Sequence, residues 1–249
     1  MQTEDGFMSH LVELRDRLLK AVCAVGLIFL VLLIWPGPAY IWDVLANPLQ
    51  QALPQGTKMI ATGVITPFMI PVKLTGMVAF VLSLPVVLYQ IWAFVAPGLY
   101  QHEKRLALPL IFSSTALFLL GIAFCHFFVF GKVFAFIAEF APSSITPAPD
   151  IEAYLSFVLT MFTAFGVTFE VPIVIIVLVY TGVVSVEKLV DIRGYVIVGA
   201  FIVAAVVTPP DVMSQLLLAV PLCILYELGI IVARLIGRRK KPDPSGMGH

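Results

Sequence analysis

Six apolar runs separated by polar segments form the main pattern along this chain. They cover about residues 18–35, 72–96, 106–131, 153–180, 195–208 and 212–233. A helix needs about 20 mostly apolar residues to cross the hydrocarbon core of a bilayer, so most of these runs are long enough. The pattern therefore predicts an all-α membrane protein, a single integral membrane domain over residues 1–249 with six transmembrane helices.

The fifth run is shorter than the others. It has about 14 residues, which at about 1.5 Å per residue make a helix of about 21 Å. The hydrocarbon core is about 30 Å thick. We therefore expect either that this helix stops short or that the bilayer thins around it.

The segment before the first run is polar but carries Leu11, Leu14 and Leu18 at helical spacing after Ser9. This pattern predicts a short amphipathic helix over residues 9–17, capped by Ser9, that runs into the first span.

The loops on the side opposite the N-terminus differ in length. Residues 36–71 and 132–152 are rich in proline, glycine and small polar residues, yet both contain apolar stretches. We expect short helices there that cap the periplasmic face. The third such loop is only Thr208-Pro209-Pro210-Asp211, and its prolines predict a sharp reversal, so the last two spans should form a tight hairpin.

Prolines also lie inside four of the runs, at Pro85, Pro109, Pro172 and Pro221. An interior proline removes one backbone hydrogen bond and pushes away the carbonyl four residues earlier. We therefore expect bent helices that form a concave bundle.

Composition supports a bilayer environment, because 60% of the residues are hydrophobic and 12% are charged. Soluble domains usually carry about 25% charged residues. The net charge is zero, which argues against a nucleic-acid partner, since such proteins show a basic excess.

Basic residues are strongly asymmetric between the two sides. One side collects twelve: Arg15, Arg17, Lys20, Lys104, Arg105, Lys188, Arg193, Arg234, Arg238, Arg239, Lys240 and Lys241. The other collects Lys58, Lys73 and Lys132. By the positive-inside rule, both termini, including the tail 234–249, should be cytoplasmic.

Signatures of catalysis are missing from the sequence. It contains no GxxxxGK[ST] loop, no HExxH pair and no GxSxG elbow. Cys23, Cys125 and Cys223 lie singly in apolar runs without metal-ligand spacing. We therefore expect no enzymatic activity, no cofactor and no metal.

Glu170 is the outstanding ionisable residue, because it lies within the fourth run. A charged side chain at the centre of a bilayer costs about 2.5–3.5 kcal/mol on insertion scales, and such residues usually mark function. It could contact a polar partner helix or line a water-filled pocket. The alternative is a protonated side chain bonded to a neighbouring helix.

Other polar residues allow two interpretations. Glu103 follows a rigid Pro97–Tyr100 turn and could accept an arginine, or belong to a solvated charge cluster with Lys104 and Arg105. Glu13 and Arg17 have the spacing of a helix-stabilising pair. Thr208, Gln215 and Glu227 could pack internally or meet a partner helix.

Several segments, in order, resemble the TatC family of the twin-arginine translocase. They are His10–Leu18, Pro48 with Gln55-Gly56 and Thr66–Phe68, Tyr89–Arg105, Phe165–Pro172, Gly199–Phe201 and Thr208–Gln215. The resemblance covers about residues 9–235 and its motifs are long.

The resemblance implies a function in protein export across the bacterial inner membrane. Members of this family bind the twin-arginine signal peptides of folded proteins and assemble with single-span TatA- and TatB-type proteins into a multimeric complex. The proton-motive force drives transport. It implies signal-peptide binding for Glu103, Glu13, Phe94, Arg15 and Arg17, and functional positions at Pro48, Glu170 and Asp211.

The main alternative from the residues is a proton-coupled secondary transporter, suggested by Glu170 and the proline-interrupted helices. Such carriers usually contain internal repeats, and none is visible between the first three runs and the last three.

Overall fold

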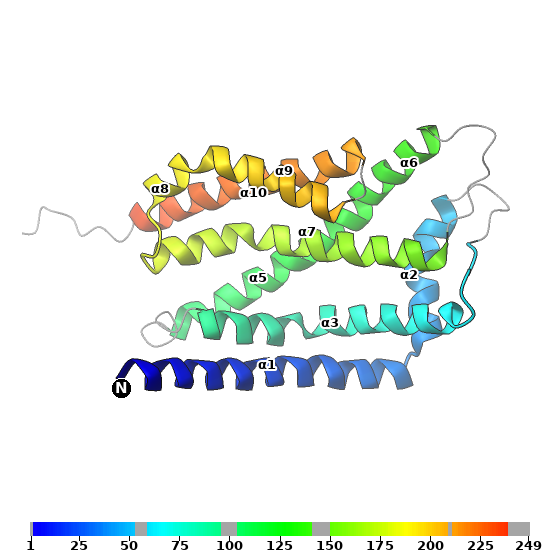
Figure 1. Ribbon diagram of the computed structural model, residues 1–249, viewed down its shortest axis with the longest axis horizontal. Helices are drawn as coiled ribbons and strands as arrows, with labels where there is room; N and C mark the ends of the chain where they lie inside the picture. Colours follow the sequence, from blue (N-terminus) through cyan, green and yellow to red (C-terminus); the bar gives the residue numbers. More distant parts are fainter. Residues whose placement is uncertain (1, 53–58, 96–103, 141–149, 209–210, 239–249) are drawn as a thin grey trace, which may run out of the picture.

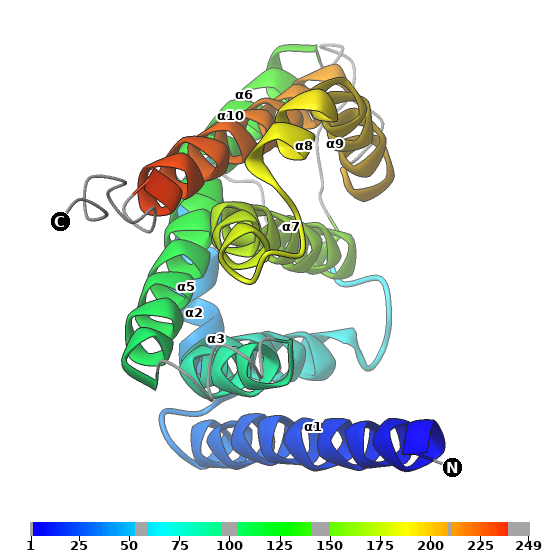
Figure 2. The same cartoon turned by 90° about the vertical axis from the view of Figure 1, so that its left-hand side faces the viewer.

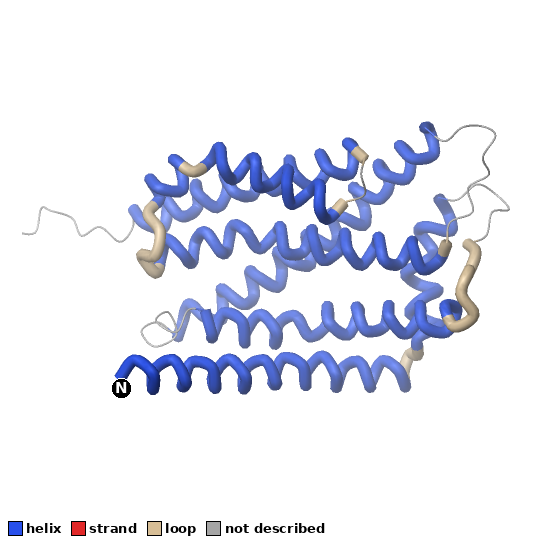
Figure 3. Tube along the Cα trace, in the orientation of Figure 1, coloured by secondary structure: helices blue, strands red, loops and turns tan. Residues whose placement is uncertain are grey.

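The structure, a computed structural model, describes residues 2–52, 59–95, 104–140, 150–208 and 211–238. This part of the chain is mainly helical, with short loops between the helices, and contains no strand (Figure 3). Its helices are α1 (Gln2–Ile34), α2 (Pro38–Ala52), α3 (Thr66–Val95), α5 (Lys104–Phe124), the π-helical turn η1 (Cys125–Val129), α6 (Phe130–Phe140), α7 (Ile151–Tyr180), α8 (Val186–Asp191), α9 (Arg193–Val207) and α10 (Val212–Arg238).

Among the described residues, five segments are long and apolar enough to cross a membrane, judged by length and composition. They are Leu11–Ile34, Thr66–Phe94, Pro109–Phe136, Ile151–Tyr180 and Val212–Ile236. The helix Arg193–Val207 is apolar but shorter, with 15 residues. The expectation of a short fifth apolar helix is therefore confirmed.

The helices are arranged in layers. α1 and α3 lie side by side, α7 lies beyond α3, and the α9–α10 hairpin lies beyond α7 (Figure 1). The continuous helix formed by α5, η1 and α6 crosses these layers on one side (Figure 2). The beginning of α1, the end of α7, α8 and the end of α10 lie at one end of the molecule, whereas α2, the end of α6 and the start of α7 lie at the other.

Two expectations about local structure are wrong. Ser9 is not a cap, because α1 already begins at Gln2 and continues through residues 9–17 into the first apolar run. In the segment 132–152, we expected a separate capping helix. Its described residues 132–140 instead continue α5 through η1 in α6, which keeps Cys125, Val129 and Val133 buried in the core, and residues 141–149 lie outside the described part. The other long loop does contain a helix of its own, α2.

All four prolines lie inside helices as expected, and Pro71 adds a second one in α3. The π-helical turn was not expected, because no proline falls within Cys125–Val129. A π-turn inserts one residue into the helical repeat and shifts the face that follows. This shift explains how one continuous helix can pack on α7 and also extend past it.

Glycines allow the central helices to approach closely. A Cβ atom at Gly121 of α5 would lie 2.6 Å from the carbonyl oxygen of Phe165 in α7. A Cβ at Gly166 of α7 would lie 2.5 Å from the ring of Phe118 in α5. Small residues at helix contacts are typical of membrane bundles, where van der Waals packing is the main source of association. The α5–α7 contact is the rigid framework for the site described next.

Candidate functional site

A buried chain of polar side chains joins three helices in the apolar interior. The indole Nε1 of Trp92 in α3 donates a hydrogen bond of 3.1 Å to the Ser114 hydroxyl oxygen in α5. The Ser114 hydroxyl in turn donates to Oε2 of Glu170 in α7. Trp92 is 5% exposed and Ser114 is fully buried. The sequence singled out Glu170, and the structure gives it one direct partner, Ser114, which is itself bonded to Trp92; neither residue was predicted from the sequence.

The surroundings of this chain are apolar. Leu84 and Leu88 from α3, Phe118 from α5, and Ile173 and Val177 from α7 pack together with Trp92. In such surroundings a polar group without a hydrogen bond costs free energy. The second oxygen of Glu170, Oε1, is nevertheless buried without a partner among the described residues.

Charged side chains on α1 form local pairs. Both Nε and one terminal nitrogen of Arg17 donate to Oε1 of Glu13, at 2.9 and 2.6 Å. Arg15 donates to Asp16 at 2.8 Å, and these two side chains are exposed. The helix-stabilising pair between Glu13 and Arg17, four residues apart, is therefore present, as their spacing suggested.

Two of the residues implicated by the resemblance, Phe94 and Pro48, lie in described helices, and a third, Glu103, does not. Phe94 lies near the end of α3 and is half-buried. Pro48 lies in α2, a different helix from the one that carries the charged pairs. Glu103, together with its preceding Pro97–Tyr100 turn, lies outside the described residues.

Several polar groups of the α9–α10 hairpin find partners within the hairpin, although Oδ2 of Asp211 and the Ser214 hydroxyl are buried without a partner among the described residues. The Thr208 hydroxyl donates to the Ala204 carbonyl at 2.8 Å, and the Gln215 amide donates to the Phe201 carbonyl at 3.2 Å. Asp211 caps α10, because its Oδ1 accepts from the Ser214 amide at 2.6 Å. Thr208 and Gln215 therefore each have a hydrogen-bond partner within the hairpin. Pro209 and Pro210 lie outside the described residues.

An ion pair connects the start of α9 to α10. Arg193 donates to Glu227 at 2.7 Å, and the Tyr226 hydroxyl donates to the Leu189 carbonyl at 2.7 Å. The sequence left the partner of Glu227 open, and the structure gives it a partly exposed ion pair within the chain. The pair is 34 residues apart in sequence, so no local spacing rule could have found it.

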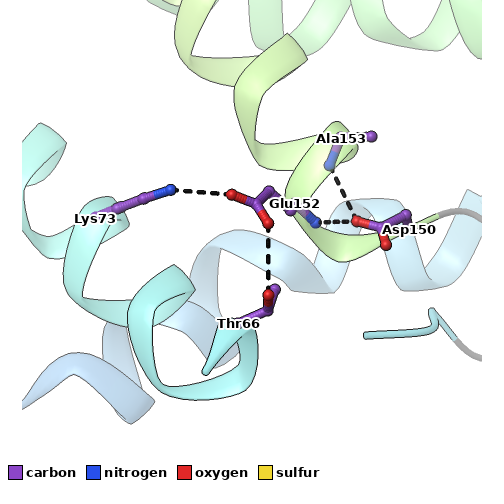
Figure 4. A network of polar contacts seen from close by, with 5 residues as sticks. All are labelled: Thr66, Lys73, Asp150, Glu152 and Ala153. Atoms are coloured by element: carbon purple, nitrogen blue, oxygen red, sulfur yellow. Dashed lines mark hydrogen bonds and ion pairs between the residues drawn. The ribbon is translucent and has the colours of Figure 1, made fainter. Parts of the chain in front are cut away.

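A second polar network lies where α3 and α7 begin (Figure 4). Glu152 accepts from Lys73 at 3.2 Å and from Thr66 at 3.4 Å. Asp150 caps α7 by accepting from the amides of Glu152 and Ala153. Sequence analysis missed this network, although an aspartate directly before an apolar helical run is a recognisable cap signal.

The cap residue is electrostatically stabilised as a carboxylate. The Thr62 hydroxyl and the amides of Ala153 and Glu152 donate to Asp150 and hold its pKa below the ordinary value. Hydrogen bonds of this kind favour the charged form.

An apolar groove of about 510 Å³ runs between α1 and α3. It is lined by Leu18, Ala21, Val22, Val25, Gly26, Phe29, Gly76, Phe80 and Val87. Its lining begins one residue after Arg17, so the charged pairs of α1 and the groove are neighbours along the helix.

The fold and these sites define a multi-pass helical membrane protein with a buried polar chain in its interior. Residues 9–221 match the family model of the Sec-independent protein translocase protein (TatC). This chain belongs to the TatC family and is a component of a protein translocase.

Individual relatives agree with this assignment. The chain is 52% identical over 240 residues to a Sec-independent protein translocase protein TatC of Haemophilus influenzae, covering 96% of this chain and 92% of the relative. It is 50% identical over 236 residues to the Escherichia coli TatC, covering 94% and 91%. A Halothiobacillus neapolitanus TatC is 52% identical over 235 residues, and this chain spans 64% of its length.

A solved structure is similar as well. The crystal structure of a twin-arginine translocase receptor TatC superposes with a TM-score of 0.80 at 37% identity, covering 92% of this chain and all of the other.

Proposed function

We propose that this chain is the receptor for twin-arginine signal peptides in the bacterial inner membrane. The observation that carries the proposal is its likeness, with a TM-score of 0.80, to a structure described as a twin-arginine translocase receptor. On this proposal the chain has six spans, with α9 as the short fifth one, and both termini are cytoplasmic.

The distribution of basic residues supports this orientation. Arg15, Arg17 and Lys20 lie near the middle of α1, on the N-terminal side of its uncharged stretch 21–34, and Arg234 lies near the end of α10. The beginning of α1 and the end of α10 lie at the same end of the molecule (Figure 1). Positively charged flanks favour the cytoplasmic side.

We place signal-peptide recognition at Glu103, Glu13 and Phe94, with Arg15 and Arg17 beside them. The two arginines of the signal carry planar guanidinium groups that carboxylates can bind in a bidentate manner, which lysine cannot reproduce. In the free protein Arg17 already donates two hydrogen bonds to one oxygen of Glu13, Oε1. An incoming arginine would therefore exchange with Arg17 rather than meet an isolated carboxylate.

The apolar part of the signal needs an apolar surface. The groove between α1 and α3 begins at Leu18 and contains only apolar side chains and glycines. We propose that it receives this part of the peptide, so that charged and apolar recognition follow one another along α1.

Transport itself needs further components. We propose that TatA- and TatB-type single-span proteins join this chain in a multimeric complex and that the proton-motive force supplies the energy. Glu170, Thr208 and Gln215 are the proposed contacts for partner helices. Pro48 and Asp211 are proposed to keep α2 and the α9–α10 hairpin in a functional arrangement.

The receptor role can be tested by crosslinking a photoreactive twin-arginine signal peptide to the full-length protein in membranes. Replacing Glu103 by Gln removes one charge-assisted hydrogen bond, worth about 1.5–3 kcal/mol, and should weaken crosslinking about tenfold or more. Glu187→Gln is the control, because Glu187 is a carboxylate in the first turn of α8 that has no proposed role.

The outcomes separate the claims. A peptide with two lysines should crosslink poorly to the wild type. Equal crosslinking of the wild type and Glu103→Gln would refute the site while keeping the receptor. If the wild type does not crosslink even with its partners present, the receptor proposal fails, and solute flux into liposomes would test the transporter alternative.

A further inference from the structure

The apolar groove between α1 and α3 contains a glycine that the packing of this chain does not explain. Gly26 of α1 lines the groove, and a Cβ atom added to it would meet no atom of another helix within 4 Å. Gly121, Gly166 and Gly229 are different, because a Cβ atom there would lie 2.6, 2.5 and 2.8 Å from a neighbouring helix. These three glycines allow contacts within the chain, whereas Gly26 leaves open space.

A glycine inside a helix needs a reason, because it makes the helix less stable than alanine would. In membrane bundles the usual reason is the close approach of a second helix, since association there depends on van der Waals packing. We propose that Gly26 is a specificity-determining residue, which lets the apolar segment of the signal peptide approach α1 closely and requires glycine or alanine at the facing peptide position. This inference rests on the proposed function, in which the groove receives that segment.

The groove can be reached from the bilayer. Leu18 and Val22 in its α1 wall are 60% and 58% exposed, and Phe80 in its α3 wall is 36% exposed. α1 packs mainly on α3 and lies at the edge of the layers (Figure 2). A helix within the membrane can therefore come into contact with Gly26.

The order of residues along α1 favours the signal peptide as the occupant. The groove starts at Leu18, directly after Arg17 and its partner Glu13, and its lining contains only apolar residues and glycine. A peptide with charged residues followed by an apolar helix matches this order. A lipid acyl chain would also suit the apolar lining, but it is thin and flexible and gains nothing specific from a missing side chain.

The spacing along α1 predicts which peptide residue must be small. Gly26 lies 13 residues after Glu13, which is about 20 Å along a helix. A helical signal that runs parallel to α1, with one arginine at Glu13, would present to Gly26 the residue about 13 positions after that arginine. Residues three or four positions away from this one lie on the same face of the peptide helix.

A disulfide scan tests this contact directly. The full-length protein in membranes would carry Gly26→Cys with its native cysteines replaced by alanine, and each signal peptide would carry one cysteine at a successive position. A disulfide needs Cβ atoms about 4 Å apart, so under a mild oxidant it should form only near the predicted position, with a spacing of three or four residues.

The chain offers a matched control for this scan. Cys23 is exposed on α1, three residues before Gly26, but it does not line the groove. A variant that keeps Cys23 as its single cysteine should therefore form little disulfide with the same peptides. Equal yields from Cys23 and from Gly26→Cys would overturn the inference.

Filling the groove tests the requirement for a small residue. Gly26→Leu should weaken crosslinking of a photoreactive signal peptide about tenfold, because it overpacks a close helix contact, and Gly26→Ala should weaken it less. Gly131→Leu is the control, because a Cβ atom at Gly131 of α6 also meets nothing within 4 Å and Gly131 lies outside the groove. With the wild-type protein, leucine at the predicted peptide position should weaken crosslinking by a similar factor, and here no change in the protein can disturb its folding.

The inference and the receptor proposal fail separately. If Gly26→Leu and the leucine-bearing peptide both crosslink as strongly as the unchanged pair, the groove holds lipid chains and the inference is overturned, while the receptor role stands. If the wild type captures no signal peptide at all, the receptor role fails and the inference fails with it.

Discussion

Two acidic residues of the same helix, Glu152 and Glu170, form very different polar networks. They are 18 residues apart in α7, which is about 27 Å along a helix. The Glu152 side chain is 51% exposed and pairs with a lysine that is 49% exposed. Glu170 meets Ser114 in apolar surroundings, with one oxygen unpartnered among the described residues.

The difference shows that solvent, more than the chemical group, decides what a carboxylate contributes. In water, an exposed ion pair is worth about 0–1 kcal/mol because both charges are well solvated when apart. In an apolar interior every missing hydrogen bond has a cost. The network around Glu152 should therefore stabilise the contact between α3 and α7 only weakly. In the network around Glu170, removal of a single hydrogen-bonding atom should lower the stability of the protein measurably.

The largest stability effect should come from Ser114→Ala. It leaves the Trp92 N–H and the Glu170 Oε2 atom without their partner, and such a loss costs about 1–3 kcal/mol. Reversible unfolding in mixed micelles would measure it, with Ser113→Ala as the control that should change little. A loss no greater than that of the control would show that the buried network is not held together as described.

A smaller effect is expected from Asp150→Ala, which removes the cap of α7. The melting temperature should fall, but by less than in Ser114→Ala, because water can solvate the exposed amides. Asp150→Asn should retain most of the stability, since asparagine is also a good cap. A fall equal to or larger than that of Ser114→Ala would contradict the comparison.

Asp150 should also make stability depend on pH. Its pKa in the folded protein is lowered, so the folded state favours the carboxylate more than the unfolded state does. This contribution is present above the ordinary aspartate pKa and is lost as pH falls through the lowered value. Melting curves at decreasing pH should show this loss in the wild type, and the loss should be weaker in Asp150→Asn, which cannot titrate.

The smallest effect should follow from Glu152→Gln, which removes the charge that pairs with Lys73. An exposed pair of this kind contributes about 1 kcal/mol or less and is screened by salt. Unfolding at low and high ionic strength would measure the difference between the variant and the wild type, which should shrink as salt is added. A difference that is large and independent of salt would show that the two networks are alike after all.

Much of the architecture follows from local sequence pattern. The apolar runs locate the long helices, because burying an unpaired backbone in a bilayer is costly and only helices satisfy every group within one segment. The short length of α9 and the prolines inside α3, α5, α7 and α10 could also be predicted. Glu170 was recognisable from its position alone, since a carboxylate in an apolar run is rare.

Partners could not be predicted in this way, because they come from distant parts of the chain. Ser114 and Glu170 are 56 residues apart, and Arg193 and Glu227 are 34 apart. Their meeting depends on how the helices cross, and the crossing of α5 and α7 depends on close approach at Gly121 and Gly166. Sequence periodicity therefore determines which segments become helices, while three-dimensional packing decides that a tryptophan, a serine and a glutamate from three of them form one chain of hydrogen bonds.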